Sequence, residues 1–209
     1  MVKTVRFLLA AIVLLLAGMH ASGQSALSDK ERMLSEEVEA QMNATMELLK
    51  HSVNINSGTF NVKGVREVGE VYRKELNQIG FQTEWIRMPD SLKRAGHLVA
   101  FKKGKKGKKV FLIGHLDTVF EPDMPFSPFT LLNDSTATGQ GVNDMKGGNV
   151  MMIAALKALN TLGLLEDVTI TVYSTGDEEN AYRQDRGFAL RCRLAAFFLF
   201  EDHHRYRDR

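Results

Sequence analysis

Three stretches of the sequence place imidazole or carboxylate side chains beside the ends of predicted strands and helices. They are His115-Leu-Asp117, a glycine-rich loop at 139–148 that contains Asp144, and Gly176-Asp-Glu178-Glu179. Nitrogen and oxygen donors of these kinds bind zinc, and a carboxylate can also bridge two cations or accept a proton from water. The chain is therefore constrained to a fold that brings the three stretches together, and they supply the ligands that a binuclear zinc hydrolase needs.

Hydrophobic periodicity predicts an alternation of helices and strands. We expect helices at 25–50, at about 63–79 and at 147–162, and strands at 81–87, 97–101, 110–114 and 167–173. The last strand is rich in β-branched residues and apolar on both faces. This alternation favours an α/β layered domain with a mixed sheet, in which functional residues lie beyond the carboxyl ends of strands.

One cationic run, at 102–109, lies between two of the predicted strands. Its lysines and glycines are typical of a solvated hairpin turn, so we expect the strands at 97–101 and 110–114 to pair with each other. Polyanion binding is the alternative interpretation. It is disfavoured because a basic stripe should recur on a binding face, and this one does not.

Charge and cysteine content argue against a nucleic-acid-binding protein and against a disulfide-stabilised fold. The chain has 27 basic and 25 acidic residues, and removal of Lys3 and Arg6 with a leader brings the net charge to about zero, so no nucleic-acid partner is predicted. The single cysteine, Cys192, cannot form an internal disulfide.

The N-terminus has the pattern of a secretory signal at 1–23. Lys3 and Arg6 precede an apolar run at 7–18, and Ala21-Ser-Gly23 offers small residues for cleavage. We expect a cleaved signal peptide and a secreted or periplasmic protein, with an uncleaved anchor as the alternative.

The C-terminal segment, 181–209, differs in composition from the domain predicted at 24–180. It is rich in arginine, has no lysine and joins an apolar run at 197–200 to a polar end. We interpret it as a divergent tail whose reading frame was disrupted, with a genuine terminal strand at 194–200 as the alternative.

Each site motif is weak by itself. His115 and Asp117 lie two residues apart at a strand end and so share one face, but a satisfied histidine is a common reason for such a pair. Asp144 suits a bridging ligand in a glycine-flanked loop, although it could instead cap the following helix. The loop lacks the third glycine of a dinucleotide fingerprint.

Glu178 and Glu179 follow the last predicted strand. Adjacent glutamates in extended backbone point to opposite sides, so one can bind metal while the other faces the attacking water. A solvated acidic turn is the alternative.

Together, the three motifs resemble the M20 family of zinc peptidases and amidohydrolases, closest to its glutamate-carboxypeptidase-like branch. The resemblance extends over about residues 54–180 and includes Asn54-Ile-Asn-Ser-Gly-Thr59. It implies a mixed-sheet, zinc-exopeptidase-type α/β catalytic domain with helices on both faces. It also implies two zinc ions in the complete site, with cobalt or manganese as substitutes, and a peptide or N-acyl amino acid substrate.

Residue by residue, the resemblance implies His115 as a zinc ligand, Asp117 as its orienting partner and Asp144 as the bridging ligand. Glu178 matches the general base and Glu179 a ligand of the other metal, and the peptide bond after Asp144 is expected to be cis. Glu201 is a weak candidate for a further carboxylate ligand, whereas no resemblance reaches His203 or His204.

Family members are longer and carry a lid domain that forms their homodimer. We therefore expect a truncated catalytic domain without the lid, with weak metal binding and little or no turnover. The alternatives are a non-catalytic, metal-binding pseudo-enzyme and an unfolded degradation substrate whose exposed sheet edge aggregates.

Overall fold

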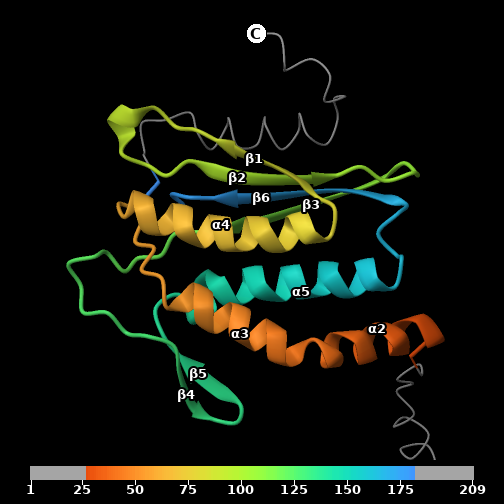
Figure 1. Cartoon of the computed structure of the whole chain (residues 1–209). Coiled ribbons are helices and arrows are strands. Elements are labelled where there is room, and N and C mark those ends of the chain that lie inside the picture. Colours follow the sequence, from red (N-terminus) through yellow and green to blue (C-terminus); the bar gives the residue numbers. More distant parts are fainter. Residues whose placement is uncertain (1–26, 182–209) are drawn as a thin grey trace, which may run out of the picture. The chain divides into compact units, whose positions relative to one another are not determined.

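The computed structural model describes residues 27–181, arranged as a sheet with helices (Figure 1). The chain divides into two compact units, residues 1–33 and residues 34–209, and the fold below is that of the second unit. In the first unit, the backbone N–H of Ser28 donates to Glu31 (2.8 Å), and these two residues form the capping box that begins α2. The predicted signal peptide at 1–23 and almost all of the predicted tail lie outside the described residues.

The helices agree with the predictions in position. They are α2 (Asp29–Ala40), α3 (Met42–Val53), α4 (Val62–Gln78) and α5 (Gly148–Thr161), with a short 3-10 helix, η1 (Asp90–Leu92), and a π-helical turn, η2 (Val142–Gly147). The single helix predicted at 25–50 is divided into α2 and α3, which meet at Gln41. Gly80 ends the α4 segment with a φ of 81°, a conformation that glycine adopts without strain.

Four strands form the main sheet in the order β1-β2-β6-β3. Their bounds are β1 (Gln82–Ile86), β2 (His97–Lys102), β3 (Lys108–His115) and β6 (Val168–Thr175). β6 runs antiparallel to β2 and parallel to β3, so the sheet is mixed and the α/β prediction is confirmed. The short hairpin of β4 (Thr130–Asn133) and β5 (Thr136–Thr138), for which the sequence analysis predicts no strands, forms a separate two-stranded sheet.

The predicted pairing of β2 with β3 is wrong, because β6 lies between them. The lysine run does not close a hairpin. It lies beside the segment that leads into β6. Lys105 N–H donates to Glu166 O (2.8 Å), and the Lys106 ammonium lies 2.6 Å from the Asp167 carboxylate. Complementary charge at this end and the apolar character of β6 on both faces favour a central place for β6.

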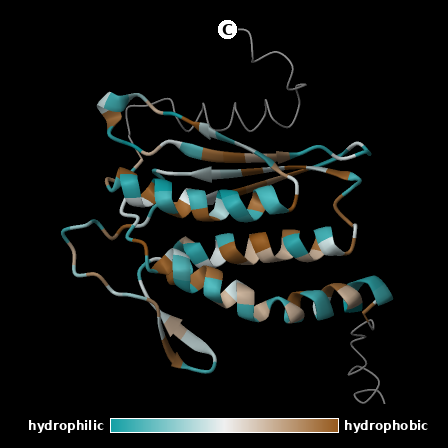
Figure 2. Cartoon of the chain, in the orientation of Figure 1, coloured by the Kyte–Doolittle hydropathy of each residue, from teal (hydrophilic) through white to brown (hydrophobic). Residues whose placement is uncertain are grey.

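The hydrophobic core lies between one face of the sheet and the helices α4 and α5 (Figure 1). Val65, Val68 and Leu76 of α4 belong to the same buried cluster as Val150 and Ile153 of α5. Hydrophobic residues are more frequent on α5 than on α4 (Figure 2), as expected for a helix that contacts the sheet, α4 and α3. None of the helices in residues 27–181 is long and apolar enough to cross a membrane.

Candidate functional site

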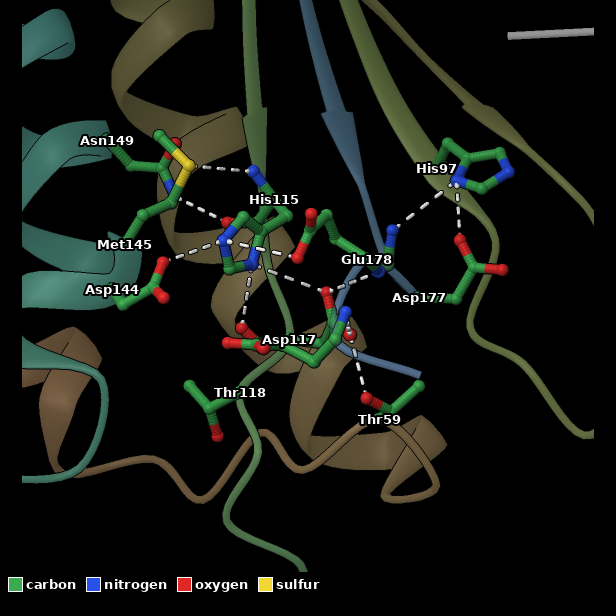
Figure 3. Close-up of polar contacts among 12 residues, drawn as sticks. Thr59, His97, His115, Asp117, Thr118, Asp144, Met145, Asn149, Asp177 and Glu178 are labelled. Carbon is green, nitrogen blue, oxygen red and sulfur yellow. Dashed lines mark hydrogen bonds and ion pairs between the residues drawn. The ribbon is translucent and has the colours of Figure 1, made fainter. Parts of the chain in front are cut away.

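The topology places two of the three motifs at one edge of the sheet. β3 and β6 are parallel neighbours with His115 opposite Thr175, so both strands end together. His115 is the last residue of β3, and Glu178 follows β6 by three residues. Parallel strands present their carboxyl ends at one edge, so this pairing brings His115 and Glu178 together (Figure 3).

Asp144 reaches the same place from η2, which precedes α5. It has non-helical backbone angles, and the Asp144–Met145 peptide bond is cis, as the family resemblance implies. Asp144 caps neither η2 nor α5, because no side-chain capping bond begins either helix. Its Oδ1 lies 3.1 Å from His115 Nε2 instead.

His115, Asp144 and Glu179 form a cluster that could hold a metal ion. One ligand atom from each lies within 4.8 Å of the other two. Glu178 is adjacent, with Oε2 4.0 Å from His115 Nε2. The His115 side chain is only 8% exposed, whereas that of Asp144 is 72% exposed and that of Glu178 59%. The site is therefore buried at His115 and open to solvent at Asp144 and Glu178.

The hydrogen bonds of His115 leave its Nε2 directed at the carboxylates. Nδ1 lies 3.0 Å from the backbone oxygen of Asp117, which can only accept, so Nδ1 carries the proton. The Asp117 carboxylate lies 3.5 Å from the same nitrogen. A second hydrogen bond of this kind fixes the tautomer and the ring orientation of metal-binding histidines.

The backbone of His115 forms hydrogen bonds with residues of η2 and α5. Its N–H donates to the Met145 sulfur (3.3 Å), and its carbonyl accepts from Asn149 Nδ2 (2.6 Å). Gly114 permits this approach, because a Cβ there would lie 2.4 Å from Asn149 Oδ1. These contacts fix the loop that carries Asp144 relative to the end of β3.

Asp117 is the buried centre of the site. It is 1% exposed, and its carboxylate accepts hydrogen bonds from the Thr59 hydroxyl (2.7 Å) and from the backbone N–H groups of Glu178 and Glu179 (3.0 Å each). Burial opposes its ionisation, but hydrogen bonds from His115, Thr59 and the two amides hold the pKa of Asp117 below its ordinary value. Asp117 thus joins the two strand ends.

The ionisation of the site favours a cation at its centre. Burial disfavours the imidazolium, yet hydrogen bonds and charge from Asp117, with Asp144, raise the pKa of His115 to about 9. Burial and the neighbouring carboxylates raise the pKa of Glu179. Protein nitrogen and carboxylate oxygen are zinc donors, and a divalent cation would relieve the repulsion among these acids. The residues present therefore fit the zinc that the family resemblance implies.

Several residues that hold the site have no role predicted from the sequence. Thr59 lies inside the 54–59 stretch but has no recognisable signal of its own. Met145 and Asn149 act through contacts with the backbone of His115, which periodicity and motif spacing do not reveal. Glu201, His203 and His204 lie outside the described residues.

Lys146 offers a test of the loop that carries Asp144. It is 1% exposed, its ammonium donates to Ile55 O (2.7 Å), and burial lowers its pKa to about 8. Between pH 8 and the pKa of a free lysine, about 10.4, the unfolded chain binds a proton that the folded chain has released. We expect the free energy of unfolding to rise by about 3 kcal/mol across this window, relative to Lys146→Met. Urea titrations of both proteins at each pH measure it, and parallel curves would contradict it.

Comparison with known proteins shows the family to which the chain belongs. Residues 111–196 match the model of peptidase family M20/M25/M40. The chain is 31% identical over 170 residues to carboxypeptidase G2 of Pseudomonas sp. (strain RS-16), covering 81% of this chain and 40% of that protein. This chain belongs to peptidase family M20. Its family is metal-dependent, and its enzyme class by family is that of peptidases and related hydrolases.

Two further comparisons agree. The chain is 32% identical over 117 residues to a probable succinyl-diaminopimelate desuccinylase of Staphylococcus epidermidis, covering 54% of this chain and 28% of that protein. Human carnosine dipeptidase 1 shares the fold, with a TM-score of 0.68 and 20% identity over 84% of this chain and 40% of that one. The chain thus spans less than half the length of these three proteins.

Proposed function

We propose that this domain is the metal-binding part of a zinc-dependent hydrolase that cleaves an amide bond in a peptide or an N-acyl amino acid. The convergence of His115, Asp144 and Glu179, one ligand atom each within 4.8 Å, carries the proposal. The peptidase and desuccinylase relatives support the amide bond as the target. The complete site would hold two zinc ions, with His115, Asp144 and Glu179 among their ligands.

Zinc bound by His115, Asp144 and Glu179 would acidify water and polarise the substrate carbonyl. The residues of the chain supply the remaining steps. The backbone oxygen of Asp117 keeps a proton on His115 Nδ1, so that Nε2 would be the nitrogen that binds metal, and the Asp117 carboxylate anchors the backbone of Glu178. The exposed carboxylate of Glu178 would accept a proton from the attacking water as the C–O bond forms. It would then return that proton to the amine nitrogen as the C–N bond breaks.

Removal of His115 tests the metal site. We expect His115→Ala to weaken zinc binding by at least about 100-fold, because the cluster loses its nitrogen donor and keeps only carboxylate ligands. Calorimetric titration of the full chain with Zn²⁺ measures the affinity and the number of ions bound. His51→Ala, in an exposed histidine of α3, is the matched control and should leave the affinity unchanged.

Equal zinc affinity for His115→Ala and the wild type would overturn the proposal. One bound zinc ion rather than two would place all three ligands on a single metal. A catalytic zinc site with three protein ligands would still be complete in that case. Zinc binding with no hydrolysis of dipeptides or N-acyl amino acids would favour the non-catalytic, metal-binding alternative.

A further inference from the structure

We infer that Arg94 and His97 are positioning residues that hold the two ends of the turn carrying Glu178 and Glu179. The inference rests on the proposed function, because it concerns the orientation of these two glutamates. The turn consists of residues 176–180, and the segment that holds it, residues 94–97, leads into β2 on the side of β6 away from β3.

His97 holds the beginning of the turn. It is the first residue of β2, is 7% exposed, and accepts a hydrogen bond at Nδ1 from the backbone N–H of Gly176 (3.3 Å; Figure 3). The acceptor role requires an unprotonated Nδ1. The ring also packs on Tyr173, with ring centroids 5.5 Å apart, and the Asp177 carboxylate lies 4.0 Å from Nδ1. The imidazole is therefore held between Tyr173 of β6 and Asp177 in the turn.

Arg94 holds the end of the turn. One guanidinium nitrogen donates to Asn180 O (2.9 Å) and another to Leu92 O (3.1 Å). The guanidinium also lies 4.2 Å from the centre of the Phe60 ring. Since Phe60 follows Thr59, Arg94 joins the residue directly after Glu179 to the segment that supplies a hydrogen bond to Asp117.

Two glycines let the segment and the turn approach backbone to backbone. A Cβ on Gly176 would lie 2.2 Å from the carbonyl oxygen of Gly96, so no side chain fits there. Gly96 itself has a φ of 84°. The close approach places Arg94 and His97 on either side of a backbone contact, which explains how side chains three residues apart reach both ends of one turn.

The turn is therefore held from two directions. On the side of β3, Asp117 accepts the N–H groups of Glu178 and Glu179. On the side of β2, His97 and Arg94 bind Gly176 and Asn180. If Asp117 were the only anchor, the middle of the turn would be held but both of its ends could move. With all four bonds, the backbone that directs the two glutamate side chains has one orientation.

The test separates local positioning from general stability. His97→Leu and Arg94→Met remove the two bonds, whereas His97→Asn keeps a polar acceptor near Nδ1 and Arg94→Lys keeps a cationic donor. Lys102→Met is the matched control, because Lys102 donates to Ile79 O (2.6 Å) and Asn160 Oδ1 (3.2 Å) at the other end of β2. In the full chain, hydrogen exchange measures protection of the Glu178 and Glu179 amides, and Co²⁺ titration measures metal affinity.

We expect His97→Leu and Arg94→Met each to accelerate exchange at the Glu178 and Glu179 amides by at least about tenfold relative to Val172 in β6. Each should also weaken Co²⁺ binding by about tenfold, and His97→Asn and Arg94→Lys should recover most of both losses. Unchanged exchange at the two amides, or an equal change in Lys102→Met, would overturn the inference. If the wild type binds no Co²⁺ while the exchange pattern holds, the proposed function fails and the positioning role stands.

Discussion

Glu178→Gln is expected to lower kcat for amide hydrolysis by about 10²- to 10⁴-fold, the usual contribution of a positioned general base. Glutamine has nearly the same size and keeps the backbone N–H bond to Asp117, but its amide oxygen accepts a proton far less readily than a carboxylate does. Glu178 is also outside the cluster of three ligands, so zinc affinity should stay within about threefold of the wild type.

The measurement is hydrolysis of dipeptides and N-acyl amino acids by the zinc-loaded chain, at chain concentrations high enough to follow the weak turnover that we expect, with zinc affinity determined on the same samples. Glu166→Gln is the matched control: the same substitution in an exposed glutamate that pairs with Lys105 before β6 begins. A variant that keeps its turnover would remove Glu178 from the reaction. One that loses zinc as well would make Glu178 a ligand instead of a base.

The structure brings together His115, Asp144 and Glu179, which the sequence motifs and the family resemblance had singled out, whereas it corrects the predicted order of the sheet. The place of β6 between β2 and β3 could not be predicted, because the partner of a strand depends on competition among all strands. The glycines and lysines at 102–109 resembled a hairpin turn, while the acidic residues that bind this run, Glu166 and Asp167, lie far away in sequence.

The contacts that hold the site could not be predicted from the sequence either. Thr59 meets Asp117 across 58 positions of the chain, and Gly176 meets His97 across 79. Each is a single hydrogen bond between segments that no periodic pattern connects. Gly176 and Gly96 could be recognised as important only once their backbones were seen in contact. Motifs thus identify the groups that do chemistry, and the fold identifies the groups that orient them.

Asp117→Ala is expected to lower the free energy of unfolding by about 3–5 kcal/mol, a large part of the stability of a domain this size. The substitution leaves the Thr59 hydroxyl and the N–H groups of Glu178 and Glu179 without their acceptor at a position that is 1% exposed. The loss should shrink as the pH falls below about 3.9, the ordinary value for aspartate. The lowered pKa of Asp117 means that it stabilises the folded chain above that pH, and that this stabilisation disappears as the folded carboxylate is protonated.

Urea unfolding of the metal-free proteins at neutral and acid pH measures both effects. Asp167→Ala is the control, because Asp167 is a partly exposed carboxylate paired with Lys106, and the loss of such a pair costs at most about 1 kcal/mol. Thr59→Val removes only one of the donors and should cost about 1 kcal/mol. If Asp117→Ala is no less stable than Asp167→Ala, the three hydrogen bonds do not hold the strand ends together. Other contacts would then have to hold the metal ligands in place.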